Sequence, residues 1–411
     1  MRILQINSHY DKGGAARIVA CIHRQLLQKQ EESYVAFGRG KRPEEENVYR
    51  FDLPCEVYAS ALAGRITGKH GFYNTAATRR LLTFIEKVQP DVVHLHALHG
   101  YYLNLPLLFS YLRKKGLPCV WTFHDCFAFT GDCGYFFECE RWKEGCGNCP
   151  DIHRYPESKW FDRSAWMWKR KKQMFEVPGM VIVSPSDWLT EMAKASFLGK
   201  YECITIRNGI DTAHTFYPRN KQACRKKYGY QPQEKLILGI AAGYHDSRKG
   251  AVYMMEMAKA LQKEAKVILI GWDEKKNALP ADTDNIITLP NTADADMLAE
   301  YYSMADVFVL TSLAENYATV VLEAMACGTP VVGFASGGTP EQLKGKRGIV
   351  VKTKDQQALN EGVRKALQED NGLLSGEALA EELRRENSVE KMTDSYLALY
   401  HDVGAKGSEP G

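Results

Sequence analysis

The sequence predicts an α/β protein made of two tandem, doubly wound domains, each built on a parallel β-sheet. Short β-branched runs alternate with longer helical patterns along most of the chain, as in right-handed βαβ units. These runs are almost continuously apolar, which is typical of parallel strands covered by helices on both faces. A chain of 411 residues is also too long for one compact core. The strand–helix series occurs twice, which favours two Rossmann-like domains facing a cleft.

The expected strands fall into two series of six. Those of the first series are residues 2–7, 33–38, 91–96, 118–124, 180–185 and 203–208. Those of the second series are residues 235–243, 265–272, 285–290, 306–312, 329–334 and 348–351. Asn-Gly, Pro and polar residues cluster between the two series, at 206–220, as expected of a domain junction.

We therefore expect an N-terminal domain over residues 1–205 and a C-terminal domain over 206–385. The apolar spacing after them predicts a helix over 386–403, which we expect to pack back toward the N-terminal domain. The polar residues 404–411 are expected to form a disordered tail.

Composition narrows the function classes. The net charge of +3 is too small to indicate nucleic acid as the main partner. No apolar run approaches the length of a membrane span, and the first residues lack the pattern of a signal peptide. We therefore expect a cytoplasmic protein. Four consecutive cations, Lys169 to Lys172, follow two tryptophans; they form either a solvated helix face or a peripheral contact with anionic lipid.

One insertion, residues 126–162, interrupts the strand–helix alternation. It is rich in Cys, Gly and aromatic residues, and it includes Cys133, Cys139, Cys146 and Cys149. Thiols stay reduced in the cytosol, which disfavours disulfides. Cys146 and Cys149 have the close spacing of a zinc knuckle, whereas the other pair is more widely spaced. We expect a structural zinc ion that orders the insertion; the alternative is four unrelated free thiols.

Residues 310–341 carry the most informative pattern. Glu315 and Glu323 stand eight residues apart, a rise of roughly 12 Å in a helix, which is about the sugar-to-ribose span of a nucleotide-diphosphate sugar. The backbone amides near Tyr317, Ala318 and Thr319 open the helix between them, so they could receive a diphosphate. The alternative is two solvated glutamates, but a charge inside an apolar helix needs a partner.

Two further sets of residues lie where ligands bind in doubly wound domains. Gly13 and Gly14 form a turn between the first strand and the first helix, where the backbone can approach an anion closely. His124 stands beside Asp125 at the end of strand 118–124. The segment "HLHALHG" at 94–100 offers three more histidines, which we interpret as acceptor contacts or packing residues rather than metal ligands.

On these motifs the chain resembles family 4 retaining glycosyltransferases of the GT-B fold. The Glu-x7-Glu pair with "EAMACGTPVV" after it, "IRNGID" at 206–211 and "FHD" at 123–125 carry the resemblance. Within that family, "TGDC" and "GCGNCP" together with "HGYYLNL" resemble the colanic-acid type of exopolysaccharide glycosyltransferase.

The resemblance implies a role for each matching residue. Glu315 would contact the donor sugar, Glu323 the nucleotide ribose, and His124 the sugar or the reacting centre. Lys249 would neutralise the diphosphate of a UDP- or GDP-sugar, without a catalytic metal. Gly13 and Gly14 would approach the donor phosphate or the acceptor.

The sequence departs from the family pattern at one position. An arginine usually stands five residues before that lysine, and here Tyr244 occupies the position, so Arg248 is expected to supply the missing charge.

The implied function is transfer of a sugar to a saccharide or lipid-linked saccharide during exopolysaccharide or cell-surface polysaccharide synthesis. Two other classes remain open at this point. One is a GT-B protein that binds a nucleotide sugar without turnover. The other is a metal- or redox-sensing protein based on the cysteines of residues 126–149.

Overall fold

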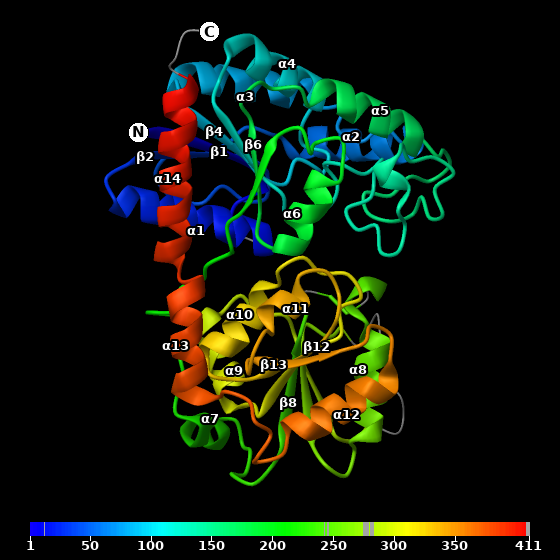
Figure 1. Ribbon diagram of the computed structural model, residues 1–411, viewed down its shortest axis with the longest axis vertical. Coiled ribbons are helices and arrows are strands. Elements are labelled where there is room, and N and C mark those ends of the chain that lie inside the picture. Colours follow the sequence, from blue (N-terminus) through cyan, green and yellow to red (C-terminus); the bar gives the residue numbers. More distant parts are fainter. Residues whose placement is uncertain (12, 242, 245, 274–278, 280–282, 408–411) are drawn as a thin grey trace. The chain divides into compact units, whose positions relative to one another are not determined.

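The computed structural model describes residues 1–11, 13–241, 243–244, 246–273, 279 and 283–407. The chain forms two compact units, each an α/β layered structure with a parallel sheet (Figure 1). The first unit comprises Met1–Arg207 together with Met392–Gly411, and the second comprises Asn208–Lys391.

The first unit contains a seven-stranded sheet in the order β3-β2-β1-β4-β5-β6-β7, and neighbouring strands are parallel throughout. Its strands are β1 Arg2–His9, β2 Glu32–Arg39, β3 Val48–Arg50, β4 Val92–Leu95, β5 Cys119–Thr122, β6 Val181–Ser184 and β7 Glu202–Thr205. Its helices include α1 Gly14–Gln28, α2 Pro54–Thr67, α3 Thr75–Val88, α4 Leu105–Lys115, α5 Ser164–Met174 and α6 Asp187–Lys194. The six strands that the sequence predicts for this half are all present.

The last helix, α14 (Val389–Gly407), packs on the first unit from Met392 onward. The hydroxyl of Tyr400 lies 2.6 Å from His94 on β4, and the hydroxyl of Tyr396 lies 2.9 Å from Thr122 on β5. The helix runs past the expected end at 403 as far as Gly407, and residues 408–411 of the expected tail lie outside the described residues.

The second unit contains a six-stranded sheet in the order β10-β9-β8-β11-β12-β13, again with parallel neighbours. Its strands are β8 Leu236–Ile240, β9 Lys266–Ile270, β10 Ile286–Leu289, β11 Val307–Leu310, β12 Val331–Phe334 and β13 Gly348–Val351. Its helices include α7 Lys221–Lys227, α8 Ala251–Ala260, α9 Ala295–Met304, α10 Thr319–Ala326, α11 Thr339–Gln342, α12 Gln356–Ala366 and α13 Gly376–Asn387.

Each sheet has a point where the strand order reverses, between β1 and β4 in the first unit and between β8 and β11 in the second. Ligands of doubly wound domains bind beyond the carboxyl ends of the strands at such a point. The candidate residues of the two units should therefore be sought in the loops that follow these strands.

Candidate functional site

In the second unit, the loops after β8 and β11 bring two cations to one carboxylate. Lys249 ends a single 3₁₀ turn, Ser247–Lys249, and its Nζ lies 2.8 Å from Oε2 of Glu315. Nη1 of Arg248 lies 3.6 Å from the same oxygen and donates a hydrogen bond to the carbonyl of Ala314. The cluster therefore forms where the strand order reverses, from residues 66 positions apart in the chain.

Gly250 allows the two loops to approach this closely. Its φ is +67°, and a Cβ added there would stand 2.0 Å from the carbonyl oxygen of Thr311. The hydroxyl of Thr311 donates to the carbonyl of Lys249 at 2.9 Å, which fixes the backbone of the cation. Only glycine satisfies both the left-handed φ and the contact.

The carboxylate of Glu315 is held in its charged form. Its side chain is only 12% exposed, and burial raises its pKa, but Lys249 and Arg248 outweigh burial and hold the pKa below its usual range. Both cations keep about a fifth of their side-chain surface in solvent, 21% for Lys249 and 18% for Arg248. Arg248 also forms an ion pair with Asp246, with Nη2 3.2 Å from Oδ2.

Tyr244, which replaces the arginine of the family pattern, is a core residue. It is 4% exposed, its ring packs on Trp272 with centroids 5.4 Å apart, and a Cβ on Gly239 would stand 2.7 Å from its hydroxyl. Its side chain therefore fills space in the core against β8.

Glu323 lies inside α10 and is 2% exposed. The hydroxyl of Tyr302, on α9, donates to its Oε2 at 2.9 Å. This is the partner that a charge within an apolar helix requires. Glu323 is consequently much less accessible than Glu315.

The helix start between the two glutamates is clamped from α11. The amide of Ala318 donates to Oε1 of Gln342 at 3.1 Å, and Nε2 of Gln342 donates back to the carbonyl of Ala318 at 3.0 Å. Tyr317 is buried, and its hydroxyl accepts from Asn387. Thr319 is half-buried and is the first residue of α10, so its amide belongs to the turn that lacks intrahelical acceptors.

In the first unit, His124 ends a chain of hydrogen bonds that crosses three strands. Nε2 of Gln5 donates to the carbonyl of Val19, which leaves its Oε1 to accept from Nε2 of His96 at 3.2 Å. Nδ1 of His96 then accepts from Nε2 of His124 at 3.1 Å. We call this the Gln5–His96–His124 relay. It assigns the tautomer in which Nδ1 of His124 is a hydrogen-bond acceptor.

The other groups around His124 are also paired. Burial lowers the pKa of His124 to about 4 although Asp125 opposes this effect, so the ring is neutral near pH 7. Oδ2 of Asp125 lies 2.5 Å from Nε2 of His99, and Oδ1 accepts from the amide of Phe127. Sequence reasoning assigned no role to Gln5, and only general ones to His96 and His99. The signal that could have identified them is that polar residues stand within or directly after strands that are otherwise apolar.

Gly13 is the N-cap of α1, and Gly14 is its first residue. Gly13 has φ +92°, and a Cβ added at either glycine would meet nothing within 4 Å. The backbone is therefore accessible at this helix start, as expected for an anion or hydroxyl contact.

The basic run on α5 is not uniformly exposed, so one expectation is wrong. Lys171 is 0% exposed, and its Nζ donates to the carbonyls of Phe127 and Thr130 at 2.6 and 3.3 Å. Trp168 is also buried, and its indole N–H donates to the carbonyl of Trp142. Helical spacing turns these two side chains toward the insertion, whereas Lys169, Arg170 and Lys172 are exposed.

Four of the five cysteines in residues 126–162 line a single pocket, namely Cys133, Cys139, Cys146 and Cys149. Burial raises the pKa of the Cys133 thiol to about 12 and that of Cys146 to about 11. Across the described part of the chain, no three metal-binding side chains stand at coordination distance, and no disulfide joins the cysteines. Also among the described residues, no helix combines the length and apolar character that crossing a membrane requires.

Comparison with known proteins agrees with this geometry. Residues 12–214 match the family model Glycosyltransferase Family 4, and residues 220–385 match Glycosyl transferases group 1. The chain is 27% identical to the colanic acid biosynthesis glycosyl transferase WcaC of Escherichia coli K12, over 98% of this chain and all of that one.

Two solved structures show the same fold over almost their whole length. Sucrose-phosphate synthase from Thermosynechococcus elongatus has a TM-score of 0.72 at 18% identity, covering 98% of this chain and 99% of that one. Anabaena Alr3699/HepE in complex with UDP-glucose has a TM-score of 0.69 at 13% identity, covering 98% and 100%. With two family models that together span nearly all of its length, the chain belongs to the family 4 glycosyltransferases of the GT-B fold.

Proposed function

We propose that the protein transfers a hexose, with retention, from a nucleotide-diphosphate sugar to a saccharide or lipid-linked saccharide acceptor in exopolysaccharide or cell-surface polysaccharide synthesis. The observation that carries the proposal is the meeting of Lys249 and Arg248 with Glu315 at the strand-order reversal of the second unit. The UDP-glucose complex of HepE and the name of WcaC support the donor class and the pathway class.

The donor would be held by charge and by backbone amides. Lys249 and Arg248 would face the diphosphate and stabilise the negative charge that grows on the leaving nucleoside diphosphate, so no catalytic metal is needed. The first-turn amides of α10, beginning at Thr319, would add donors aligned with the helix dipole. When Lys249 and Arg248 pair with the phosphate instead of Glu315, the carboxylate of Glu315 would be available to accept hydrogen bonds from sugar hydroxyls.

Glu323 would accept hydrogen bonds from the ribose. Because its carboxylate already accepts from Tyr302, it is oriented before the nucleotide binds. A buried, oriented carboxylate forms stronger hydrogen bonds than a solvated one.

His124 would act as a neutral group on the sugar side. The relay leaves Nδ1 as an acceptor, so it suits a sugar hydroxyl as donor, and its low pKa keeps it uncharged at neutral pH. A neutral imidazole avoids repelling the positive charge that develops on the sugar ring as the glycosidic bond breaks. Gly13 and Gly14 would approach the donor phosphate or the acceptor through their open backbone.

A screen of UDP- and GDP-sugars by thermal shift, followed by NMR of the product's anomeric proton, tests the proposal. Lys249→Met and Glu315→Gln should abolish most transfer, whereas Lys227→Met, which breaks an exposed ion pair with Glu300, should keep it. A product of inverted configuration would contradict retention. Full transfer by both site variants would place the donor site elsewhere.

A nucleotide-sugar-binding protein without turnover is the second candidate, because the core position of Tyr244 removes one cation that the family pattern supplies. It predicts stabilisation by a donor sugar but neither transfer nor slow donor hydrolysis. Measured turnover of any donor by the wild type, lost in Glu315→Gln, would eliminate it.

We also propose a peripheral contact with anionic lipid at the cytoplasmic face of a membrane. The cations Lys169, Arg170 and Lys172 are exposed, and Trp160 and Phe161, just before the helix, are 65% and 50% exposed. Such a mixture of cations and aromatic rings suits a headgroup region. Equal co-sedimentation with phosphatidylglycerol and phosphatidylcholine vesicles would contradict the contact; a preference for the former that added salt weakens would support it.

A further inference from the structure

We propose that Cys133, Cys139, Cys146 and Cys149 bind one zinc ion as thiolates, and that this ion holds the insertion that follows His124 in shape. Four thiolates form a closed tetrahedral site with no position for a substrate, so the ion would be structural. The inference concerns a different part of the chain from the donor site and does not depend on the proposed transfer.

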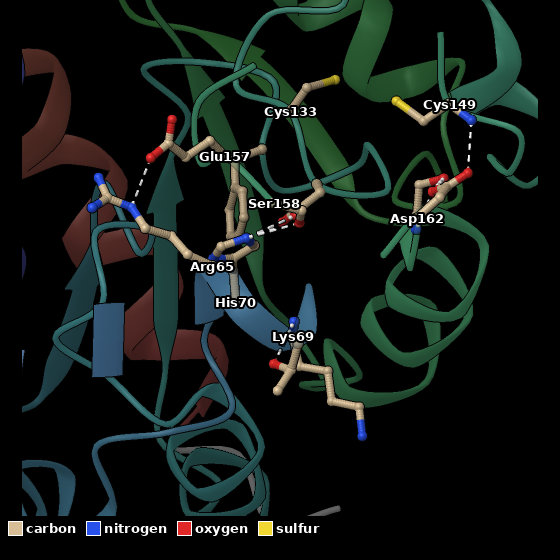
Figure 2. A network of polar contacts seen from close by, with 12 residues as sticks. Arg65, Lys69, His70, Cys133, Cys149, Glu157, Ser158 and Asp162 are labelled. Atoms are coloured by element: carbon tan, nitrogen blue, oxygen red, sulfur yellow. Dashed lines mark hydrogen bonds and ion pairs between the residues drawn. The ribbon is translucent and has the colours of Figure 1, made fainter. Parts of the chain in front are cut away.

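The four side chains form a spatial group even though they span 17 positions of sequence. All of them line one pocket, and in Figure 2 the sulfur atoms of Cys133 and Cys149 point toward the same space. Within the described residues no three such side chains stand at coordination distance, so binding requires the thiols to turn further into the pocket.

The backbone around the last two cysteines is ordered by hydrogen bonds and by a turn. The amide of Gly131 donates to Sγ of Cys146 at 3.1 Å, and amide donors to sulfur favour the thiolate. The amide of Cys149 donates to Asp162 at 2.7 Å, a contact drawn in Figure 2. The tight turn Gly145–Asn148 has positive φ at every residue, which an ion joining Cys146 to Cys149 would hold in place.

The charge of the pocket also suits a thiolate cluster. Zinc with four thiolates carries a net charge of −2, which is costly to bury without a cation. The side chain of Lys171 is fully buried, and negative charge on Asp132, Cys133 or Cys146 would raise its pKa and so favour its ammonium form. It would offset part of that charge, which gives this buried lysine a role beyond its bonds to the carbonyls of Phe127 and Thr130.

The insertion needs such a support. Between the end of β5 and the start of α5 the only helical element is the 3₁₀ turn Arg141–Lys143, and long segments without regular structure need other means of ordering. The rings of Phe129 and Phe136 pack on Trp142 with centroids 5.0 and 5.2 Å apart, and this aromatic group joins the core of the first unit.

Hydrogen bonds connect the insertion with the residues beside His124. The amide of Gly134, next to Cys133, donates to the carbonyl of Tyr155, and the hydroxyl of Tyr155 lies 3.2 Å from Nδ1 of His99, the partner of Asp125. Loss of the ion should therefore disturb the His99–Asp125 pair as well as the insertion.

Metal analysis of the full chain, expressed in zinc-supplemented medium and purified under reducing conditions, tests the inference. We expect about one zinc per chain, lost in Cys146→Ser and in Cys133→Ser, with a lower melting temperature in both. Cys55→Ser, at an exposed position on α2, is the matched control and should keep the metal. A wild type without zinc, with iron instead, or with a disulfide among the four cysteines would overturn the inference, as would zinc that both site variants retain.

A second measurement covers the case in which the variants do not fold. Titration of the wild type with a mercurial, in the presence of a zinc-sensitive dye, should release the metal as the thiols react. Metal release before any thiol of the insertion is modified, as mapped by mass spectrometry, would mean that the zinc is bound elsewhere.

Discussion

Replacing Tyr302 with phenylalanine isolates the hydrogen bond that holds Glu323. The two side chains are buried, with 0% and 2% exposure, and the hydroxyl lies 2.9 Å from the carboxylate. A hydrogen bond to a charged group contributes about 1.5–3 kcal/mol. For a unit the size of Asn208–Lys391, each kcal/mol corresponds to roughly 2–4 °C. We therefore expect the second unit to melt about 3–12 °C lower.

Differential scanning calorimetry of Tyr302→Phe measures this shift, with Tyr301→Phe as the control because the ring of Tyr301 packs on Tyr228 instead. UDP affinity should also fall in Tyr302→Phe, since the carboxylate would lose its orientation. A melting temperature equal to that of the wild type would show that the hydroxyl does not stabilise Glu323. A large thermal shift with unchanged UDP affinity would assign Glu323 to the fold and not to the ribose.

Three further changes test other parts of the structure. In Gly250→Ala, φ is +67° and the added Cβ stands 2.0 Å from a carbonyl oxygen, so the variant should lose more than about 1 kcal/mol of stability and bind UDP more weakly. Gly116→Ala, with φ +60° and open space around the Cβ, is the control and should leave UDP binding unchanged in calorimetric titrations. The pKa of His124 in the fold, about 4, lies below its ordinary 6.5, so the unfolded chain takes up the proton first and stability should fall as pH drops from about 6.5 toward 4. In urea titrations at several pH values, His124→Gln should show a shallower fall in stability. An unchanged dependence on pH would contradict this pKa. Lys171→Met leaves two buried carbonyls without their donor and should lower the free energy of unfolding by about 1–3 kcal/mol in the same assay. Lys172→Met, at the exposed neighbouring position, should lower it by at most about 0.5 kcal/mol.

The sequence was sufficient to predict the sheets because buried parallel strands give a strong signal. All twelve expected strands are present, and the one further strand among the described residues, β3 (Val48–Arg50), has only three residues at a sheet edge. Such a short segment buries too little apolar surface to be distinguished from a loop.

Contacts between distant side chains were harder to predict. The spacing of buried residues on α5, Ser164, Met167, Trp168 and Lys171, follows one helical face, so periodicity alone could have placed Lys171 inside. The clamp of Gln342 on Ala318 has no such signal, because it depends on how α11 packs against the start of α10. The resemblance assigned Lys249 and Glu315 to the same donor, but their direct ion pair was not predicted; it depends on the adjacency of β8 and β11.

Hydrogen–deuterium exchange with and without a nucleotide sugar tests the central claim, a donor site where Lys249 and Arg248 meet Glu315, most directly. UDP-glucose and GDP-mannose should each be tried at saturating concentration. The donor that binds should slow amide exchange in peptides covering residues 246–250 and 313–320, and Lys249→Met should reduce this protection. Protection confined to other peptides of either unit, with these two segments unchanged, would contradict the site.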